Sequence, residues 1–292
     1  MANANDYRND IRPNWCPGCG HYGIQSAIAT AVAQKEIPAE KLAVISGIGC
    51  SSRIGGYFYA YGAHTTHGRA LPYAQGVKLA NEDLNVICCS GDGDAFAIGM
   101  GHTMHAFKRN VNLTYIVMDN HVYGLTKGQT SPRSDVGFVT KTSPHGSFES
   151  PLPICETAIA AGATFVAQSY CTNAKELVEL IKLGMDHEGF SFINVFSPCV
   201  TYNKRNSYDW FKENLSSLAD VAGYDPTNRE MATRVLNEKQ GLVTGLIYED
   251  KTKLSFERSL EAANNYKLDR ALVHDVVKPD ATIFNQLCDA FK

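Results

Sequence analysis

Short apolar runs alternate with helix-like stretches between residues 22 and 198 of the chain. Each apolar run ends in glycine or polar residues, which is typical of a strand buried on both faces of a sheet. Strand–helix alternation of this kind predicts an α/β fold with a doubly wound, mostly parallel sheet. The expected strands are residues 42–46, 86–90, 113–118, 164–167 and 192–196, and the expected helices are residues 22–35, 97–107 and 173–187.

After residue 203 the sequence changes character. It becomes richer in charge, its aromatic residues are scattered, and its helical segments, such as residues 227–238, are weak. We therefore divide the chain into an α/β domain, residues 1–205, and a C-terminal extension, residues 206–292. We expect the extension to pack on the core or on a partner subunit.

Composition narrows the classes of partner. The 292 residues carry a formal net charge of -3, so we expect neither nucleic acid nor an anionic membrane as a partner. The first ten residues are polar, unlike a secretory signal, and no apolar run reaches the roughly 18 residues that span a bilayer. The expected location is the cytoplasm.

Polar residues follow two of the predicted strands. The segment GDGD at residues 91–94 directly follows one strand, and Asn120 comes just after the next. Open α/β sheets bind ligands at such strand ends, and glycines beside Asp92 allow backbone N–H groups to approach an anion. Asp92 and Asn120 offer the oxygen ligands that Mg²⁺ prefers. Gly-Asp-Gly by itself could equally be a β-turn, so the two strand ends are informative only together.

The nine cysteines include one close pair, Cys16 and Cys19, in the segment WCPGCG. A redox dithiol, a zinc site and an iron–sulfur cluster are all open for such a pair. A thioredoxin-like dithiol would follow a strand, and none is predicted before Cys16. A zinc site usually has a second close pair, but Cys88 and Cys89 are adjacent in a predicted strand and point to opposite faces.

Two single cysteines lie just past predicted strands. Cys50 is in the glycine-rich segment GIGC, and Cys199 follows Pro198. Together with Cys16 and Cys19 they make a complete ligand set for a 4Fe–4S cluster. For the remaining cysteines we expect packing roles as small buried residues; these are Cys88, Cys89, Cys155, Cys171 and Cys288.

A dinucleotide site is the rival interpretation of residues 43–52, where a strand leads into G-x-G. Ser52 stands where the third glycine of that fingerprint is expected. The acidic residue that would bind the ribose about 20 positions later is also missing. These two departures argue against a nicotinamide cofactor.

Several segments together resemble one protein family, the β subunits of 2-oxoacid:ferredoxin oxidoreductases. The resemblance covers residues 10–210 and is carried by WCPGCG, GIGCSS, HTTHGR, GDGD, NHVYGLTKGQ and PCVTYN. It implies thiamine diphosphate, Mg²⁺ and one 4Fe–4S cluster as cofactors. The implied Mg²⁺ ligands are Asp92, Asn120 and the backbone carbonyl of Val122, and the implied cluster ligands are Cys16, Cys19, Cys50 and Cys199.

The resemblance also implies which residues lie at the thiamine cofactor. The expected set is Ile48, Gly49, His67, Gly91, Asp92, Gly93, Asp94, Asn120, Val122, Tyr123, Gly124, Leu125 and Thr126. Thr126 would bond a phosphate. Among the catalytic candidates, His64 and His67 would lie against the diphosphate and Lys127 near the reacting groups. Arg53 could pair bidentately with a second carboxylate of the substrate, which favours 2-oxoglutarate over pyruvate.

The function implied is the coenzyme A-dependent oxidative decarboxylation of a 2-oxoacid, with electrons passing singly through the cluster to ferredoxin. One α/β domain cannot also supply the glutamate that thiamine enzymes need, so we expect an α subunit and a dimer of αβ pairs. The alternatives are a pyruvate-specific or broad-range enzyme, and a non-catalytic subunit in which the four cysteines hold zinc. The zinc alternative leaves Asp92 and Asn120 unexplained.

Overall fold

The computed structural model describes residues 3–264, 282, 286 and 289. Cys288, for which we predicted a packing role, lies outside the described residues. Within the described part of the chain, no helix is long and apolar enough to cross a membrane.

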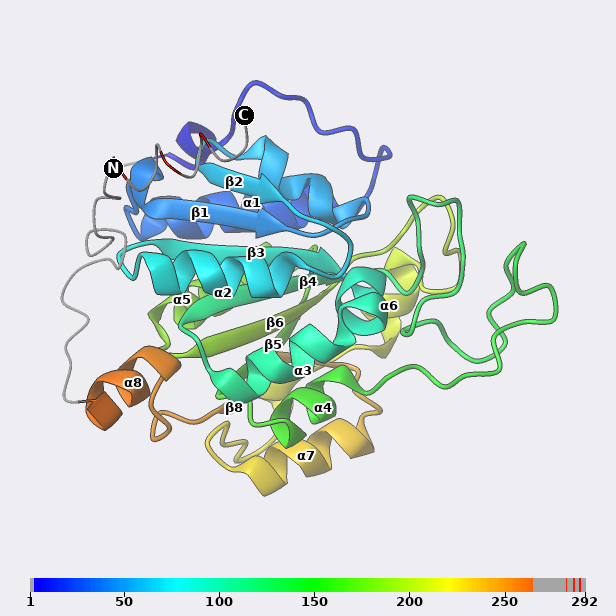
Figure 1. Ribbon diagram of the computed structural model, residues 1–292. Coiled ribbons are helices and arrows are strands. Elements are labelled where there is room, and N and C mark those ends of the chain that lie inside the picture. The colour runs from blue at the N-terminus through cyan, green and yellow to red at the C-terminus, as the bar shows by residue number, and fades with distance from the viewer. Residues whose placement is uncertain (1–2, 265–281, 283–285, 287–288, 290–292) are drawn as a thin grey trace.

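A single eight-stranded sheet forms the centre of the molecule, in the order β2-β1-β3-β4-β6-β5-β8-β7 (Figure 1). From β2 to β5 all neighbouring strands are parallel, and β8 runs antiparallel to β5. The α/β, mostly parallel prediction is therefore confirmed. The strands are β1 (Leu42–Ser46), β2 (Tyr61–His64), β3 (Asn85–Gly91), β4 (Leu113–Asp119), β5 (Phe165–Tyr170), β6 (Phe190–Phe196), β7 (Ser216–Ser217) and β8 (Val243–Glu249).

Helices cover both faces of the sheet (Figure 1). One apolar cluster joins α1 and α5 to one face, and a second joins α2, α3, α4 and α7 to the other. Cys89 belongs to the first cluster and Cys88 to the second, so their predicted opposite orientation is confirmed. The helices are α1 (His21–Gln34), α2 (Ala70–Ala80), α3 (Met100–Arg109), α4 (Ile154–Ala160), α5 (Ala174–Asp186), α6 (Tyr208–Asn214), α7 (Arg229–Glu238) and α8 (Phe256–Asn264).

The predicted helix at residues 97–107 is two elements. A π-helical turn, Asp94–Ile98, follows the GDG segment, and α3 begins at Met100. The Gly99 N–H bonds the Asp94 carbonyl five residues back. A β-carbon at Gly99 would lie 2.3 Å from that carbonyl oxygen, so glycine permits the wider turn. Strand β2 was not predicted, because at the sheet edge its residues are largely exposed and lack a buried apolar pattern.

The segment from residue 206 onward contributes to the sheet itself. Its predicted helix at residues 227–238 is α7, which packs on the same side as α4. Strand β8 was not predicted, yet it pairs with β5 and buries Val243 and Ile247. Contact of this segment with a partner subunit stays a prediction.

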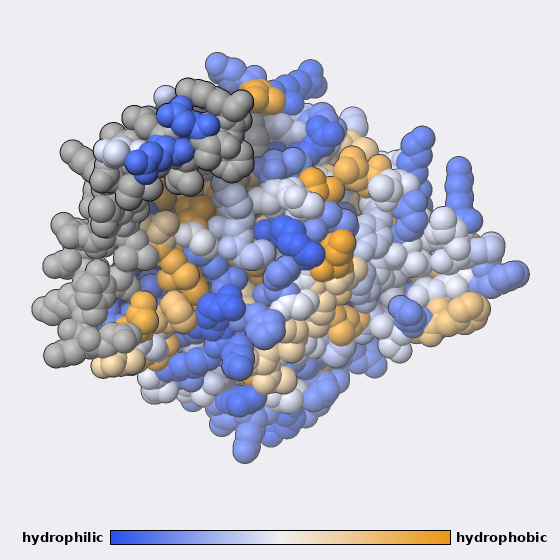
Figure 2. Space-filling model, viewed as in Figure 1, coloured by the Kyte–Doolittle hydropathy of each residue, from blue (hydrophilic) through white to orange (hydrophobic). Residues whose placement is uncertain are grey.

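A long loop at residues 130–152 projects from the body of the molecule, to the right in Figure 1. Backbone hydrogen bonds between Gly137 and Ser147 and between Ser147 and Phe138 hold its two arms together. On the face of the molecule that Figure 2 shows, apolar and hydrophilic residues are interspersed. The exposed apolar residues of the loop are Val136, Val139 and Phe148.

Candidate active site

Asp92 lies just past the end of β3 and is 2% exposed. Ser131 donates a hydrogen bond of 2.5 Å to Asp92 Oδ2, and among the described residues Asp92 makes no ion pair. Burial, with a smaller contribution from the nearby Asp119 carboxylate, raises the pKa of Asp92 to about 7. A buried carboxylate without a cation beside it is costly. The position is thus suited to binding a metal ion, and an oxygen ligand is what Mg²⁺ requires.

Asn120 lies at the end of β4, the strand that pairs with β3. Its side-chain oxygen accepts a hydrogen bond from the Val122 N–H at 3.1 Å, which leaves a second lone pair free for a metal ion. Asn120 and Val122 are both buried. The structure therefore brings the predicted Mg²⁺ ligands to the same edge of the sheet, where parallel strands end.

Asp94 is surrounded by protein donors. Its Oδ1 accepts from the backbone N–H groups of Ile48 at 3.0 Å and Gly68 at 2.8 Å. His67 Nδ1 lies 2.6 Å from the same oxygen, and Ser90 donates to Oδ2 at 2.8 Å. The carboxylate thus joins two loops to the end of β3. In the structure, Asp94 orients the predicted cofactor residues Ile48 and His67.

Two glycines allow the close packing at this edge. A β-carbon on Gly47 would lie 1.9 Å from Asp94 Oδ2, and one on Gly93 would lie 2.1 Å from the Tyr123 ring. Tyr123 donates a hydrogen bond from its hydroxyl to the Gly93 carbonyl at 3.1 Å. A side chain at either glycine would push the loops apart.

The predicted cofactor loop, residues 120–129, closes on itself. Tyr123 and Gln129 pair as an isolated antiparallel bridge, and Thr126 donates to the Gln129 side chain at 2.5 Å. Lys127 adopts a left-handed backbone, with φ of 77°, and is exposed, as are Leu125 and Thr126. The contact predicted between Thr126 and a phosphate, and the role of Lys127 in the chemistry, stay predictions.

The two catalytic histidine candidates have different surroundings. His64 is exposed at the end of β2, with Nδ1 3.1 Å from the Ser52 carbonyl oxygen and 3.3 Å from the Ser46 hydroxyl. His67 is held by Asp94, and its ring meets the Tyr123 ring edge-on at a centroid distance of 6.4 Å. Only His67 is tied directly to residues of the predicted cofactor site.

The four predicted cluster ligands share one pocket. Cys16, Cys19, Cys50 and Cys199 line it. Gly124 lies beside two of them, since a β-carbon there would be in ordinary contact with Cys50 Sγ at 3.6 Å and Cys199 Sγ at 3.7 Å. In the described part of the chain, no three His, Cys, Asp or Glu side chains surround a position for one metal ion.

Arg53 and residues of the cofactor loop line the same pocket. Besides the thiols, its walls include Arg53, Asn120, Gly124 and Leu125. The predicted thiamine site and the predicted cluster site, which are distant in the sequence, are therefore neighbours through Asn120 and Gly124.

The thiols need a cationic centre to ionise together. Burial, with smaller contributions from the neighbouring cysteines, raises the pKa of Cys19 to about 12. Burial also raises the pKa of Cys50, whereas the charge of Arg53 acts to lower it. A metal centre would stabilise thiolates in this pocket, because metal binding displaces thiol protons. The donor set thus fits an iron–sulfur or zinc centre.

Trp15 and His21 line the pocket, and no role was predicted for either from the sequence. The Trp15 Nε1–H donates to the Cys50 carbonyl at 2.6 Å, joining two cysteine loops. His21 meets the Trp15 ring edge-on and lies 2.8 Å from the Ser197 hydroxyl through Nδ1. Burial lowers the pKa of His21 to about 4, so its ring is neutral at physiological pH. The signal that could have revealed His21 is its place directly after CPGCG.

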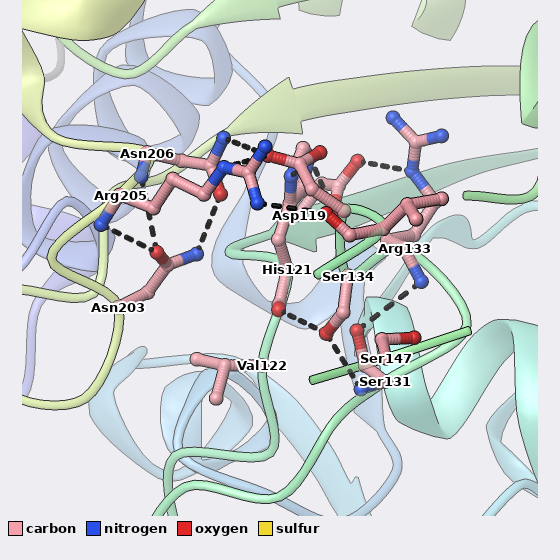
Figure 3. A network of polar contacts seen from close by, with 12 residues as sticks. Asp119, His121, Val122, Ser131, Arg133, Ser134, Ser147, Asn203, Arg205 and Asn206 are labelled. Carbon is pink, nitrogen blue, oxygen red and sulfur yellow. Dashed lines mark hydrogen bonds and ion pairs between the residues drawn. The ribbon is translucent and has the colours of Figure 1, made fainter. Parts of the chain in front are cut away.

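A polar network around Asp119 and Arg133 was also missed from the sequence (Figure 3). Arg133 Nε donates to Asp119 Oδ2 at 2.8 Å, and the guanidinium holds the pKa of Asp119 well below its usual range. The Arg133 backbone N–H donates to Ser131 Oγ at 3.2 Å, and Ser131 in turn bonds Asp92. Ser134 donates to the His121 carbonyl at 2.7 Å. The network anchors the base of the projecting loop to the ends of β3 and β4.

Fold and site together define a class of proteins, the α/β domains that bind thiamine pyrophosphate at the ends of parallel strands. Residues 47–195 match the family described as "Thiamine pyrophosphate enzyme, C-terminal TPP binding domain". Residues 199–265 match the family described as the C-terminal part of the pyruvate ferredoxin oxidoreductase beta chain.

Relatives and a solved structure narrow the class further. The chain is 39% identical over 266 residues to 2-oxoacid:ferredoxin oxidoreductase 2, subunit beta, of Aeropyrum pernix, covering 88% of this chain and 86% of that one. It is 43% identical over 209 residues to 2-oxoglutarate synthase subunit KorB of Archaeoglobus fulgidus, covering 71% and 78%. A solved 2-oxoglutarate:ferredoxin oxidoreductase of Magnetococcus marinus, with 2-oxoglutarate, coenzyme A and succinyl-CoA bound, is similar with a TM-score of 0.86. That match has 37% identity and covers 95% of this chain and 96% of the other.

The chain belongs to the family of 2-oxoacid:ferredoxin oxidoreductase β subunits. The predicted family is therefore confirmed, and an oxidoreductase of this kind is established for the chain. The β-subunit names of its relatives imply an α subunit as partner.

Proposed function

We propose that the chain, together with an α subunit, catalyses the reversible coenzyme A-dependent oxidative decarboxylation of 2-oxoglutarate to succinyl-CoA. Electrons leave singly through one 4Fe–4S cluster to ferredoxin. The observation that carries the proposal is the shared pocket, where the four cysteines meet Asn120 and Gly124 of the predicted cofactor loop. Electron transfer needs such closeness between the thiamine site and the cluster.

Thiamine diphosphate, when bound, supplies the carbanion chemistry of decarboxylation. In the proposal, Asp92, Asn120 and the Val122 carbonyl hold the Mg²⁺ that binds the diphosphate. Asp94 orients His67 towards the same edge, and Ser131 holds the Asp92 carboxylate through a short hydrogen bond. The glutamate that acts on the aminopyrimidine ring of the cofactor would come from the α subunit, in a dimer of αβ pairs.

The arrangement of the thiols favours a cluster over zinc. In a tetrahedral zinc site with Zn–S distances of about 2.3 Å, the sulfur atoms lie about 3.8 Å apart around one point. The described cysteines line a common pocket but do not surround a single ion position. A cubane cluster is larger than one ion, so its four thiolates need not meet around one point.

Arg53 supports 2-oxoglutarate as the substrate. It lines the shared pocket and carries a guanidinium that can bind a carboxylate bidentately. Relatives are named for 2-oxoglutarate, and the solved relative binds 2-oxoglutarate and coenzyme A. A pyruvate-specific or broad-range enzyme is the second candidate, because other relatives are named only for a 2-oxoacid.

Metal analysis tests the cluster. The full chain, purified without oxygen together with its partner subunit, is assayed for iron, zinc and acid-labile sulfide, and an EPR spectrum is taken after reduction with dithionite. We expect about four irons and about four sulfides per chain and the signal of a reduced cluster. Stoichiometric zinc without sulfide would remove the electron path and refute the proposal.

Cofactor analysis of Asp92→Ala tests the thiamine site separately. Removing the buried carboxylate should abolish the retention of Mg²⁺ and thiamine diphosphate, because the metal loses its charged ligand. Iron and sulfide should stay at the wild-type level. A variant that keeps its thiamine diphosphate and Mg²⁺ would show that Asp92 is not a ligand.

A further inference from the structure

We call the pocket that the four predicted cluster ligands line the cysteine pocket. Among its described residues, only His21 has a buried ring nitrogen that lacks a hydrogen-bond partner. It begins α1, directly after the Cys16–Cys19 segment and Gly20. The side chain is 1% exposed and borders the space that the four thiols share.

Ser197 decides which ring nitrogen of His21 carries the proton. The Ser197 hydroxyl lies 2.8 Å from Nδ1, and no other hydrogen-bond partner of that hydroxyl exists in the described residues. The hydroxyl proton needs an acceptor, so Ser197 donates to Nδ1 and the ring proton is on Nε2. Gly20 makes the approach possible, because a β-carbon there would lie 2.6 Å from the Ser197 hydroxyl oxygen.

The Nε2–H is therefore a buried donor without an acceptor. Buried donors in native proteins nearly always have a partner, so an orphan calls for a group that binds there. Because Ser197 occupies Nδ1, Nε2 is the nitrogen left for a group bound in the pocket that His21 lines. The acceptors that the proposed function brings to this pocket are the sulfur atoms of the cluster and its thiolates.

We propose that His21 donates a hydrogen bond from Nε2–H to a sulfur atom of the iron–sulfur centre and thereby raises its reduction potential. The inference rests on the proposed cluster. One-electron reduction adds negative charge to the sulfur atoms, which strengthens the bond and favours the reduced form. His21 is a positioning and tuning residue in this assignment, not a cluster ligand.

The test is a potentiometric titration of the cluster, followed by EPR, in the full chain with its partner subunit. His21→Phe keeps a planar ring but removes the donor. We expect the ratio of reduced to oxidised cluster at a given potential to fall about tenfold, the effect of about one lost hydrogen bond, which is a shift of about 59 mV to lower potential. Iron and sulfide content is measured on each sample.

His187→Phe is the matched control. His187 is also buried, with Nε2 2.7 Å from the Thr164 hydroxyl and Nδ1 3.8 Å from Glu249 Oε1, but it does not line the cysteine pocket. This variant should lose stability and keep the wild-type potential. Equal shifts in both histidine variants would show a general effect of lost packing and overturn the inference.

Ser197→Ala keeps the His21 ring but removes the hydroxyl that fixes which ring nitrogen carries the proton. It should therefore lower the reduction potential of the cluster by less than His21→Phe does. If His21→Phe cannot hold a cluster, His21→Leu takes its place as a variant without the donor, and an unchanged potential in it would refute the inference. A cluster present with an unchanged potential in His21→Phe would refute it directly. Wild-type protein without iron and sulfide would instead refute the proposed function.

Discussion

Asp92 and Asp94 are two residues apart in the chain, but their surroundings differ. The Asp94 carboxylate accepts bonds from Ile48, Gly68, His67 and Ser90, so protein donors stabilise its charge. Asp92 has one hydroxyl donor, from Ser131, and burial raises its pKa to about 7. The difference explains how one short motif can both hold a site together and leave a carboxylate for a metal ion.

Ser131→Ala should weaken Mg²⁺ and thiamine diphosphate binding by about 10- to 100-fold, because residues that hydrogen-bond a metal ligand orient it. Isothermal titration of the apoprotein with Mg²⁺ and thiamine diphosphate measures the change. Ser147→Ala is the control, since Ser147 lies on the same projecting loop and, among the described residues, its hydroxyl bonds only the Glu149 carbonyl. Equal affinities of the Ser131 and Ser147 variants would contradict the role of Ser131.

Arg53→Ala should lower kcat/KM for 2-oxoglutarate by about 10- to 100-fold, the range for a hydrogen-bonded charge, and leave pyruvate turnover within about threefold. Steady-state assays with both substrates and ferredoxin measure the ratio. Arg53→Lys keeps the charge without the planar guanidinium. Its kcat/KM for 2-oxoglutarate should therefore lie between those of the wild type and of Arg53→Ala. An equal loss for both substrates would rule out pairing between Arg53 and the second carboxylate.

At the scale of elements, the strands were predicted more closely than their connections. Strand β1 matches its predicted range, and β3 and β4 extend theirs by one residue or two, because apolar runs buried on both faces carry a clear signal. The turn Asp94–Ile98 was not predicted as π-helical. Its geometry depends on Gly99 and on the surrounding loops, which local sequence patterns do not describe.

His187 connects the end of α5 to β5 and makes stability depend on pH. Burial lowers the pKa of His187 below its ordinary value of 6.5. Below about pH 6.5 the unfolded chain therefore binds a proton that the folded chain does not, and the free energy of unfolding falls. In His187→Gln, the loss of stability between about pH 7.5 and about pH 5.5 should be smaller by about 1 kcal/mol.

Urea unfolding at the two pH values measures the His187 contribution. The comparison is the difference between wild type and variant at each pH, which removes the contributions of the other histidines. The charges facing His187 are Glu249, Asp250 and Lys251, all of which both proteins retain. A pH dependence as steep in the variant as in the wild type would contradict the prediction.

At the scale of the whole molecule, the segment after residue 205 completes the sheet. Strand β8 covers the edge of β5, and Phe211 packs on Phe196 with a ring-centroid distance of 4.8 Å. The division into a domain of residues 1–205 and an extension was drawn from composition. It stays a prediction, and the pairing of β8 gives it a direct test.

A chain ending at residue 205 should fail to fold into a soluble protein, because the edge of β5 loses its partner and apolar surface is exposed. A chain ending at residue 264 is the control, since it keeps both β7 and β8. Solubility, circular dichroism and thermal unfolding compare the two. Cooperative unfolding of the shorter chain at the temperature of the control would show that residues 1–205 form an independent domain.

The sequence alone determined the α/β class, five of the eight strands and the family, because these depend on periodicity and on short motifs that are contiguous in the chain. It also singled out Cys16, Cys19, Cys50 and Cys199, which the fold brings to one pocket. Tertiary structure alone decided that Ser131 holds Asp92 and that Ser197 orients His21. Those contacts join residues up to 176 positions apart, and no local pattern encodes such pairing because it follows from how strands and loops pack.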